Sequence, residues 1–263
     1  MQKNILALQF KADLESNTVN FAKVETLYKG GADVLFLPEV WCSGWFCEDF
    51  QKKAQDENGE IVSFLKDFAK KNNVNIVGGS YIRKTTDGLK NSTPVINKKG
   101  ELLAHYDKNH LFTPDGEGCL ESGEKLLCVE LEGLKIGLSI CYDIRFPELF
   151  RAFVKNGCAP QVMVNLSAWP KTRTHHYTTL CAARSIENQA YFLGLSQCGE
   201  IKNGVYNAGN SLLVNPFGEI VKQLDEKESY IFETIDTQAV AQIRENFPNL
   251  AAIRKGGYEV EYV

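Results

Sequence analysis

Short apolar runs alternate along the chain with segments whose apolar residues recur at helical spacing. In segment 17–29, Phe21, Val24 and Leu27 fall on one helical face, and Gly30-Gly31 ends the pattern. The pattern predicts helices at 17–29, 60–71, from Pro147 to Gly157, 175–189 and 237–246, the last with Thr237 as its N-cap. It predicts strands at 4–10, 33–37, 75–82, 93–97, 101–106, 135–140, 161–166, 191–196, 211–214, 219–224 and 229–235.

This order of elements predicts the α/β class. Several strands follow one another directly, as on either side of the turn 215–218, which argues against a purely parallel sheet. We therefore expect a mixed sheet, or two packed sheets with helices outside. No linker or repeat divides the sequence, so residues 1–263 are expected to form one domain, of which about the last 25 residues are a C-terminal helix and tail.

Composition excludes several classes of protein. A net charge of −4 and a pI of about 5.7 give no footprint for nucleic acid or for a membrane surface. No apolar run reaches the roughly 20 residues that span a bilayer. The first residues lack the charged head, long apolar body and cleavage site of a signal peptide, so we expect a cytoplasmic protein.

The chain has eight cysteines, none of them in a CxxC pair or beside a pair of histidines. In the cytoplasm we expect these thiols to be reduced, and most of them to be small core residues. We expect no bound metal and no cofactor, because no ligand cluster and no phosphate-binding loop is visible; Gly78-Gly79 alone is too little.

Three reactive side chains each follow a predicted strand. Glu39 comes after 33–37, Lys108 after 101–106 and Cys141 after 135–140. Since ligand crevices in α/β sheets lie outside the carboxyl ends of strands, these side chains are expected to converge. Taken singly, each residue has an ordinary explanation: a solvated carboxylate, a surface ammonium and a small buried thiol.

Together the three groups suit nucleophilic catalysis. A thiol is mostly protonated at neutral pH, and a neighbouring ammonium favours the thiolate. A carboxylate can take the thiol proton and later activate water. An ammonium can stabilise the negative charge that develops when a thiol adds to an amide or nitrile.

Five segments, in order, resemble the nitrilase superfamily of carbon–nitrogen hydrolases. They are LPEVW at 37–41, YDKNHLF at 106–112, ICYDIRFPEL at 140–149, ARSIENQ at 183–189 and NPFGE at 215–219. The resemblance implies a four-layer α-β-β-α sandwich with mixed sheets. It also implies a homodimer or higher homo-oligomer that pairs through the helices on the cysteine side.

The resemblance implies a role for each residue of the trio. Glu39 would be the general base, Lys108 the oxyanion stabiliser and Cys141 the nucleophile. A second family glutamate, in the loop after the lysine, is assigned to Glu117, with Glu121 as the alternative because the spacing from Glu117 to Gly123 is one residue shorter than the common family pattern. Either glutamate is otherwise a solvated loop carboxylate.

Four further residues are candidates for substrate contact. Tyr142 would donate its backbone N–H to the oxyanion. Arg145 and Arg173 either receive a substrate carboxylate or pair with an acidic residue of the chain itself. Trp169 either lines the acyl pocket or packs in the core.

The segment CYDIRF at 141–146 resembles the omega-amidase and deaminated-glutathione amidase branches of the family, and SAWP at 167–170 with IENQAY at 186–191 resembles bacterial omega-amidases. This implies hydrolysis, with water, of the terminal amide of dicarboxylic acid monoamides such as 2-oxoglutaramate. Deaminated-glutathione amidase, another amidase, a carbamoylase and a nitrilase remain alternatives.

Two hypotheses come from other classes. One is a Cys/His hydrolase in which His110, His175 or His176 is the base. The other is a non-catalytic binding protein on a hydrolase scaffold, against which the retention of the Glu, Lys and Cys together argues.

Overall fold

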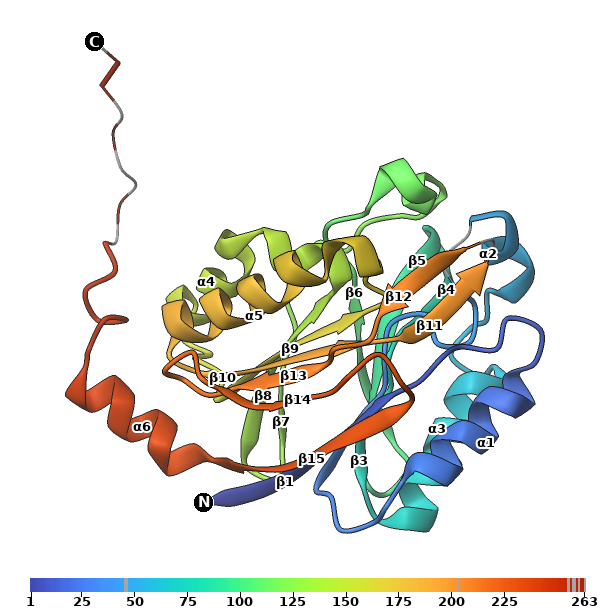
Figure 1. The fold of residues 1–263 in the computed structure, drawn as a ribbon, viewed down its shortest axis with the longest axis horizontal. Helices are drawn as coiled ribbons and strands as arrows, with labels where there is room; N and C mark the ends of the chain where they lie inside the picture. The colour runs from blue at the N-terminus through green and yellow to red at the C-terminus, as the bar shows by residue number, and fades with distance from the viewer. Residues whose placement is uncertain (45–46, 203, 255, 257–258, 260, 263) are drawn as a thin grey trace.

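The computed structural model describes residues 1–263 except 45, 46, 203, 255, 257, 258, 260 and 263. Two large sheets lie at its centre (Figure 1). The first has the strand order β15-β1-β2-β3-β5-β4, with β6 also paired to β5. Its strands are β1 (Gln2–Gln9), β2 (Val34–Phe36), β3 (Asn75–Val77), β4 (Tyr81–Thr85), β5 (Gly88–Ile96), β6 (Leu102–Asp107) and β15 (Ser229–Asp236).

The second sheet has the order β14-β13-β10-β9-β8-β7. Its strands are β7 (Cys128–Leu131), β8 (Leu134–Ile140), β9 (Val162–Ser167), β10 (Tyr191–Ser196), β13 (Leu212–Val214) and β14 (Ile220–Gln223). A separate hairpin consists of β11 (Cys198–Lys202) and β12 (Val205–Ala208). In each large sheet, three parallel strands are flanked by antiparallel ones, so both sheets are mixed, as predicted.

Helices cover the outer face of each sheet (Figure 1). On the first sheet lie α1 (Asn17–Leu27) and α3 (Glu60–Asn72), and on the second lie α4 (Pro147–Lys155) and α5 (Thr174–Asn188). The remaining helices are α2 (Cys47–Lys53) and α6 (Thr237–Asn246). The predicted four-layer α-β-β-α sandwich is thus confirmed. Among the helices of the described residues, none has the length and apolar character needed to cross a membrane.

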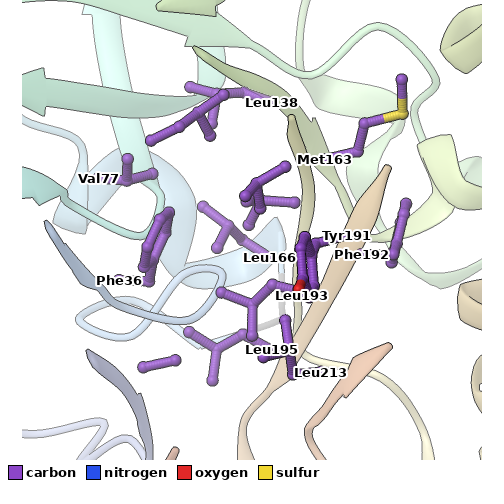
Figure 2. Close-up of a cluster of buried hydrophobic side chains, with 14 of the residues drawn as sticks. Phe36, Val77, Leu138, Met163, Leu166, Tyr191, Phe192, Leu193, Leu195 and Leu213 are labelled. Carbon is purple, nitrogen blue, oxygen red and sulfur yellow. The ribbon is translucent and has the colours of Figure 1, made fainter. Parts of the chain in front are cut away.

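The alternation of side chains along β1 shows why its sequence is apolar on both faces. Ile5 and Ala7 belong to the core between the sheets, whereas Leu6 and Leu8 belong to the core beneath the outer helices. Figure 2 shows part of the inter-sheet core, in which Phe36 and Val77 of the first sheet lie across from the leucines of the second.

Most predicted elements are present with small shifts of their ends, but several are corrected. Segment 75–82 is two strands, β3 and β4, because residues 78–80 turn away from the ladder. The N-cap of α6 is Asp236, whose carboxylate accepts from Gln238 N, and not Thr237. The short elements α2, β7, β11 and β12 have too few apolar residues to be recognised by periodicity.

The expectation of reduced thiols is wrong for some cysteines. Cys128 and Cys158 form a disulfide, and their Cα atoms are 6.7 Å apart. The two cysteines meet because β7 and the loop after α4 both lie beside β8. Cys119 is also disulfide-bonded. The side chain of Cys47 lies outside the described residues. The thiols that remain free are buried, as predicted for small core residues: Cys42, Cys141, Cys181 and Cys198.

The turn at 78–80 fixes the segment that follows β2. Gly79 has φ +65°, and an added Cβ would lie 2.3 Å from the Pro38 carbonyl oxygen and 2.6 Å from Trp41 Cδ1. Ser80 N donates to that carbonyl, and Trp41 Nε1 donates to the Gly78 carbonyl. Only glycine allows the two backbones to approach this closely.

We therefore expect Gly79→Ala to cost about 3 kcal/mol of stability, from the left-handed conformation and from steric overlap together. Gly30→Ala is the matched control, because Gly30 has φ +75° but no atom within 4 Å of an added Cβ. The control should lose only about 1 kcal/mol. Urea denaturation of the two variants measures the difference, and equal losses would show that the close approach is unimportant.

Candidate active site

Glu39, Lys108, Glu117 and Cys141, predicted from different parts of the sequence, meet at one end of the two sheets. Glu39 follows β2, Lys108 follows β6, and Cys141 follows β8; Glu117 lies in a short 3₁₀ turn at Glu117–Cys119. All four are buried, with at most 5% of the residue exposed. The predicted convergence of strand ends is therefore present.

The Lys108 ammonium lies at the centre of this group. Its Nζ donates to Glu39 Oε1 at 2.9 Å and to both carboxylate oxygens of Glu117, at 2.9 and 2.7 Å. Phe112 N donates to Glu117 Oε2 at 2.7 Å. The structure thus brings Glu117 to the lysine, whereas Glu121 is exposed and lies beside Gly88.

Asn91 joins the two carboxylates from the opposite side. Its Nδ2 donates at 3.0 Å to Glu39 Oε1 and at 3.0 Å to Glu117 Oε1. The sequence analysis did not single out this residue. The signal that would find it is the β5–β6 pairing, since Lys108 N donates to the Asn91 carbonyl and the two residues are cross-strand neighbours.

Contacts from separate segments hold Glu39 and the residue after it in place. Ala168 N, just after β9, donates to its Oε2 at 2.7 Å, and Gln197 Nε2 donates to its carbonyl oxygen at 2.6 Å. The next residue, Val40, has φ +39°, which is strained for a β-branched side chain, and its N–H is held by Ser80 Oγ. The carboxylate is therefore fixed from both sheets.

Cys141 occupies a tight turn that opens a 3₁₀ helix directly after β8. Its φ of +43° is unusual for a residue with a side chain. Its thiol lies close enough to Glu39, Lys108 and Glu117 for their charges to act on its pKa, and its carbonyl accepts from Asn165 Nδ2 at 3.3 Å. Strained turns of this kind present a nucleophile at the end of a sheet.

The fully buried Asp143 links the cysteine turn to the lysine segment. Its carboxylate accepts from Tyr106 Oη at 2.7 Å, from Ile140 N at 2.9 Å and from His110 N at 2.9 Å. The His110 ring Nδ1 lies 2.8 Å from the same carboxylate. Tyr106 and His110 stand on either side of Lys108, so one carboxylate fixes the relative position of the two segments.

The electrostatics of the site keep the thiol protonated. Burial raises the pKa of Cys141 well above its usual value, and the Glu39 carboxylate raises it further, against a smaller opposing effect of Lys108. The ammonium thus favours the thiolate, as expected, but burial and the Glu39 carboxylate outweigh it. The reason is that one cation is shared between two carboxylates.

The two glutamates shift in opposite directions. Burial raises the pKa of Glu39, and Lys108 only partly offsets this. Burial acts the same way on Glu117, but its closer contacts with Lys108 and the N–H of Phe112 outweigh it, so the pKa of Glu117 is lowered. Burial alone would lower the pKa of Lys108, but both carboxylates raise it. These shifts favour the charged forms of Lys108 and Glu117, whereas Glu39 binds a proton more readily than an ordinary carboxylate.

Two arginines lie on aromatic side chains around this group. The guanidinium carbon of Arg145 is 4.8 Å from the Trp169 ring centroid, and that of Arg173 is 5.5 Å from the Phe112 ring. Within the described ranges, neither arginine makes an ion pair with an acidic side chain. Trp169 is buried and stacks on Tyr177, and half-buried Tyr142 packs against Phe112.

Histidines do not take part in this group. The ring of His110 is engaged with Asp143 and stacks on Phe146 at 3.7 Å, and the groups that act on the Cys141 thiol are Glu39, Lys108 and Glu117. His175 and His176 are exposed in the first turn of α5. The geometry thus argues against the Cys/His alternative. Among the side chains that the structure describes, no cluster of three or more metal-ligating groups is found.

The fold and the buried Glu-Lys-Cys arrangement are those of a hydrolase class, and comparison with known proteins agrees. Residues 6–245 match the family model for carbon-nitrogen hydrolases. The chain therefore belongs to the carbon–nitrogen hydrolase family and is an enzyme of that class, which confirms the resemblance to the nitrilase superfamily.

Particular relatives span almost the whole chain. The 2-oxoglutaramate amidase of Bacillus subtilis is 34% identical in sequence to this chain, and the alignment covers 98% of this chain and 100% of that amidase. The omega-amidase NIT2 of Danio rerio is 32% identical, over 93% of this chain and 92% of its own. Among solved structures, the CN-hydrolase superfamily protein XC1258 of Xanthomonas campestris, with an arsenic adduct in its active site, has a TM-score of 0.90 and 28% identity, covering 98% of this chain and 100% of its own.

We expect Tyr106→Phe to cost about 2 kcal/mol of stability, because a buried carboxylate loses a donor. Asp143→Asn should cost more, about 3 kcal/mol. Both oxygens of the carboxylate accept hydrogen bonds from these donors, whereas an amide has only one acceptor oxygen. The double variant should lose less than the sum, because both changes remove the same hydrogen bond. Denaturant titrations of the three variants measure this coupling, and strictly additive losses would contradict it.

Proposed function

We propose that this enzyme is an omega-amidase that hydrolyses the terminal amide of dicarboxylic acid monoamides, such as 2-oxoglutaramate, and that Glu39, Lys108, Glu117 and Cys141 carry the reaction. The supporting observation is the buried hydrogen-bonded group of Glu39, Lys108 and Glu117 beside the Cys141 thiol. The full-length similarity to a 2-oxoglutaramate amidase and an omega-amidase supports the substrate class.

In the proposed acylation, Glu39 accepts the thiol proton as Cys141 Sγ bonds to the amide carbon. The carbonyl oxygen becomes an oxyanion, which Lys108 Nζ and the Tyr142 backbone N–H stabilise. Glu39 then returns the proton to the nitrogen, the C–N bond breaks, and ammonia leaves. A thioester remains on Cys141.

In the proposed deacylation, Glu39 accepts a proton from water as the water oxygen bonds to the thioester carbon. The C–S bond then breaks, the acid product forms, and Glu39 returns the proton to the sulfur. A base that accepts and returns a proton twice per turnover must have a pKa within reach of neutral pH. The raised pKa of Glu39, due mainly to burial, suits it to this role better than the lowered pKa of Glu117.

Glu117 is proposed to maintain the charge of Lys108. It chelates Nζ through both carboxylate oxygens while Glu39 takes one, and an ammonium has three N–H groups. When Glu39 becomes protonated, Glu117 still compensates the buried cation. The lysine therefore stays charged throughout the cycle, and the N–H that points to Glu39 Oε1 can turn to the oxyanion once Glu39 is protonated.

Arg145 and Arg173 are proposed to bind the free carboxylate of the substrate. The alternative, that they pair with acidic residues of the chain, is not supported by any contact within the described residues. Each guanidinium instead rests on an aromatic ring, Trp169 or Phe112, which orders it and leaves its N–H edge for a ligand. Trp169 packs on Tyr177 and carries Arg145, and we propose that it also lines the acyl pocket.

We also propose that copies of the chain pair on the cysteine side. Ile186, Phe217 and Phe247 are 51%, 70% and 63% exposed and line one largely apolar groove beside α5 and α6. Exposed apolar groups gathered in this way are typical of a subunit contact.

Replacing the nucleophile provides the direct test. Cys141→Ala should abolish ammonia release from 2-oxoglutaramate and also the acyl-enzyme seen by intact-mass spectrometry after rapid quenching. Cys181→Ala is the matched control, because Cys181 is an equally buried free thiol on α5 that contacts none of the proposed catalytic groups. A Cys141→Ala enzyme with full turnover would disprove the mechanism.

Replacing the arginines tests the substrate class. Arg145→Met and Arg173→Met should each raise KM for glutaramate at least tenfold, the loss of about 1.4 kcal/mol of charge-assisted binding. Their KM for pentanamide, which has no carboxylate, should change little. Lys99→Met removes a remote exposed charge and is the control for net charge. Wild-type activity confined to nitriles or carbamoyl compounds would refute the omega-amidase proposal.

A further inference from the structure

Asn91 has no role in the mechanism above, yet it completes a closed ring of hydrogen bonds in the site. Going around the ring, Glu39 Oε1 accepts from Lys108 Nζ, Lys108 Nζ donates to Glu117 Oε1, and Asn91 Nδ2 donates to both oxygens. Donors and acceptors alternate, and each carboxylate oxygen receives one cationic and one neutral N–H. We call these four side chains the donor–acceptor ring.

The orientation of the Asn91 amide is dictated by the two carboxylates. Its Nδ2 has two hydrogens, and the two 3.0 Å contacts use both. The reverse orientation would place a carbonyl oxygen at 3.0 Å from two anions. As a result its Oδ1 is buried and has no hydrogen-bond partner within the described part of the chain. A buried orphan oxygen is unfavourable, and its presence here indicates that the two donated hydrogen bonds matter more.

We propose that Asn91 is a positioning residue that keeps Glu39 and Glu117 from sharing a proton, so that Glu39 alone is the base toward Cys141. Two buried carboxylates with a common neighbour tend to hold one proton between them. A proton held in that way would be directed along the line between the carboxylates and not toward the thiol. Asn91 Nδ2 bridges Oε1 of Glu39 and Oε1 of Glu117, and its two hydrogen bonds favour the ionised form of both carboxylates. This inference rests on the proposed function, since it assigns Glu39 as the base.

The charged and titratable groups in and beside the donor–acceptor ring come from several different segments. They are Glu39 after β2, Lys108 after β6, Glu117 in its 3₁₀ turn, Cys141 after β8 and Tyr177 of α5. Burial raises the pKa of Glu117, and Lys108, the Phe112 N–H and, to a smaller extent, the hydrogen bond from Asn91 lower it. Loss of the amide therefore raises the affinity of the pair for a proton.

The test compares Asn91→Asp and Asn91→Leu with the wild type over a range of pH. Asn91→Leu removes the donors at similar volume, and Asn91→Asp also adds negative charge. The acid limb of kcat/KM for amide hydrolysis should move to higher pH, by about one unit in Asn91→Leu and further in Asn91→Asp. At neutral pH kcat should fall about tenfold and about 100-fold respectively, with KM nearly unchanged.

Asn188→Asp is the matched control. Asn188 is also a fully buried asparagine, its Nδ2 donates to the Arg184 carbonyl, and its Oδ1 also lacks a partner within the described residues, but it lies at the end of α5. This change should leave the acid limb in place. Thermal melting of each variant shows which are folded, and if Asn91→Asp is not, Asn91→Leu decides the question alone.

A second measurement separates this inference from the proposed function. The rate at which iodoacetamide alkylates Cys141, followed by intact mass, depends on the same proton equilibrium but needs no substrate. Its pH profile should shift in the same direction in both Asn91 variants. If the wild type hydrolyses no omega-monoamide but the alkylation profile shifts, only the substrate proposal fails. Unshifted profiles in folded Asn91 variants, or an equal shift in Asn188→Asp, would overturn the role of Asn91.

Discussion

The burial of the Lys108 ammonium is the constraint on which the rest of the site depends. Only 2% of this residue is exposed, and an isolated buried cation costs several kcal/mol. Compensation requires acidic groups at contact distance, and these come from Glu39 and Glu117, which are distant from each other in sequence. The first sheet satisfies this requirement because β2 and β6 run in the same direction, so their carboxyl ends lie at the same end of the sheet. The sheet topology therefore brings the Glu39 carboxylate to the Lys108 ammonium.

Two carboxylates around one ammonium leave an excess of negative charge beside Cys141. This excess, with burial, explains why the pKa of the thiol is raised although a lysine lies close by. A protonated thiol is a poor target for oxidants and a poor nucleophile until its proton is removed. In the proposed mechanism, reactivity is thus tied to the moment at which Glu39 accepts that proton. A site built on a resting thiolate would need the opposite balance of charge, with more cations than anions near the sulfur.

The sequence predicted the features that depend on burial on both faces of a strand. The runs before Glu39 and Cys141 are apolar because they lie between two layers, and that pattern is visible without coordinates. The run before Lys108 is of mixed polarity, and in it only Tyr106 is buried. Features that depend on contacts between distant segments were not predictable in this way. Asn91 lies in a strand of mixed polarity, and its role follows only from its register beside Lys108. The break of segment 75–82 depends on the Pro38 carbonyl, which lies 40 residues before Gly78.

The assignment of Glu117 over Glu121 has the same cause, since spacing along a loop does not show which carboxylate turns inward. The charge of the site changes sign between the buried group of Glu39, Lys108 and Glu117, called the inner group, and the two arginines around it. The inner group carries net negative charge, while Arg145 and Arg173 carry positive charge on aromatic supports outside it. A neutral amide can enter the inner group, but a carboxylate would be repelled by Glu39 and attracted by the guanidinium groups. For a dicarboxylic acid monoamide these two fields favour one orientation, with the amide at Cys141, so electrostatics alone distinguish the two ends of the proposed substrate.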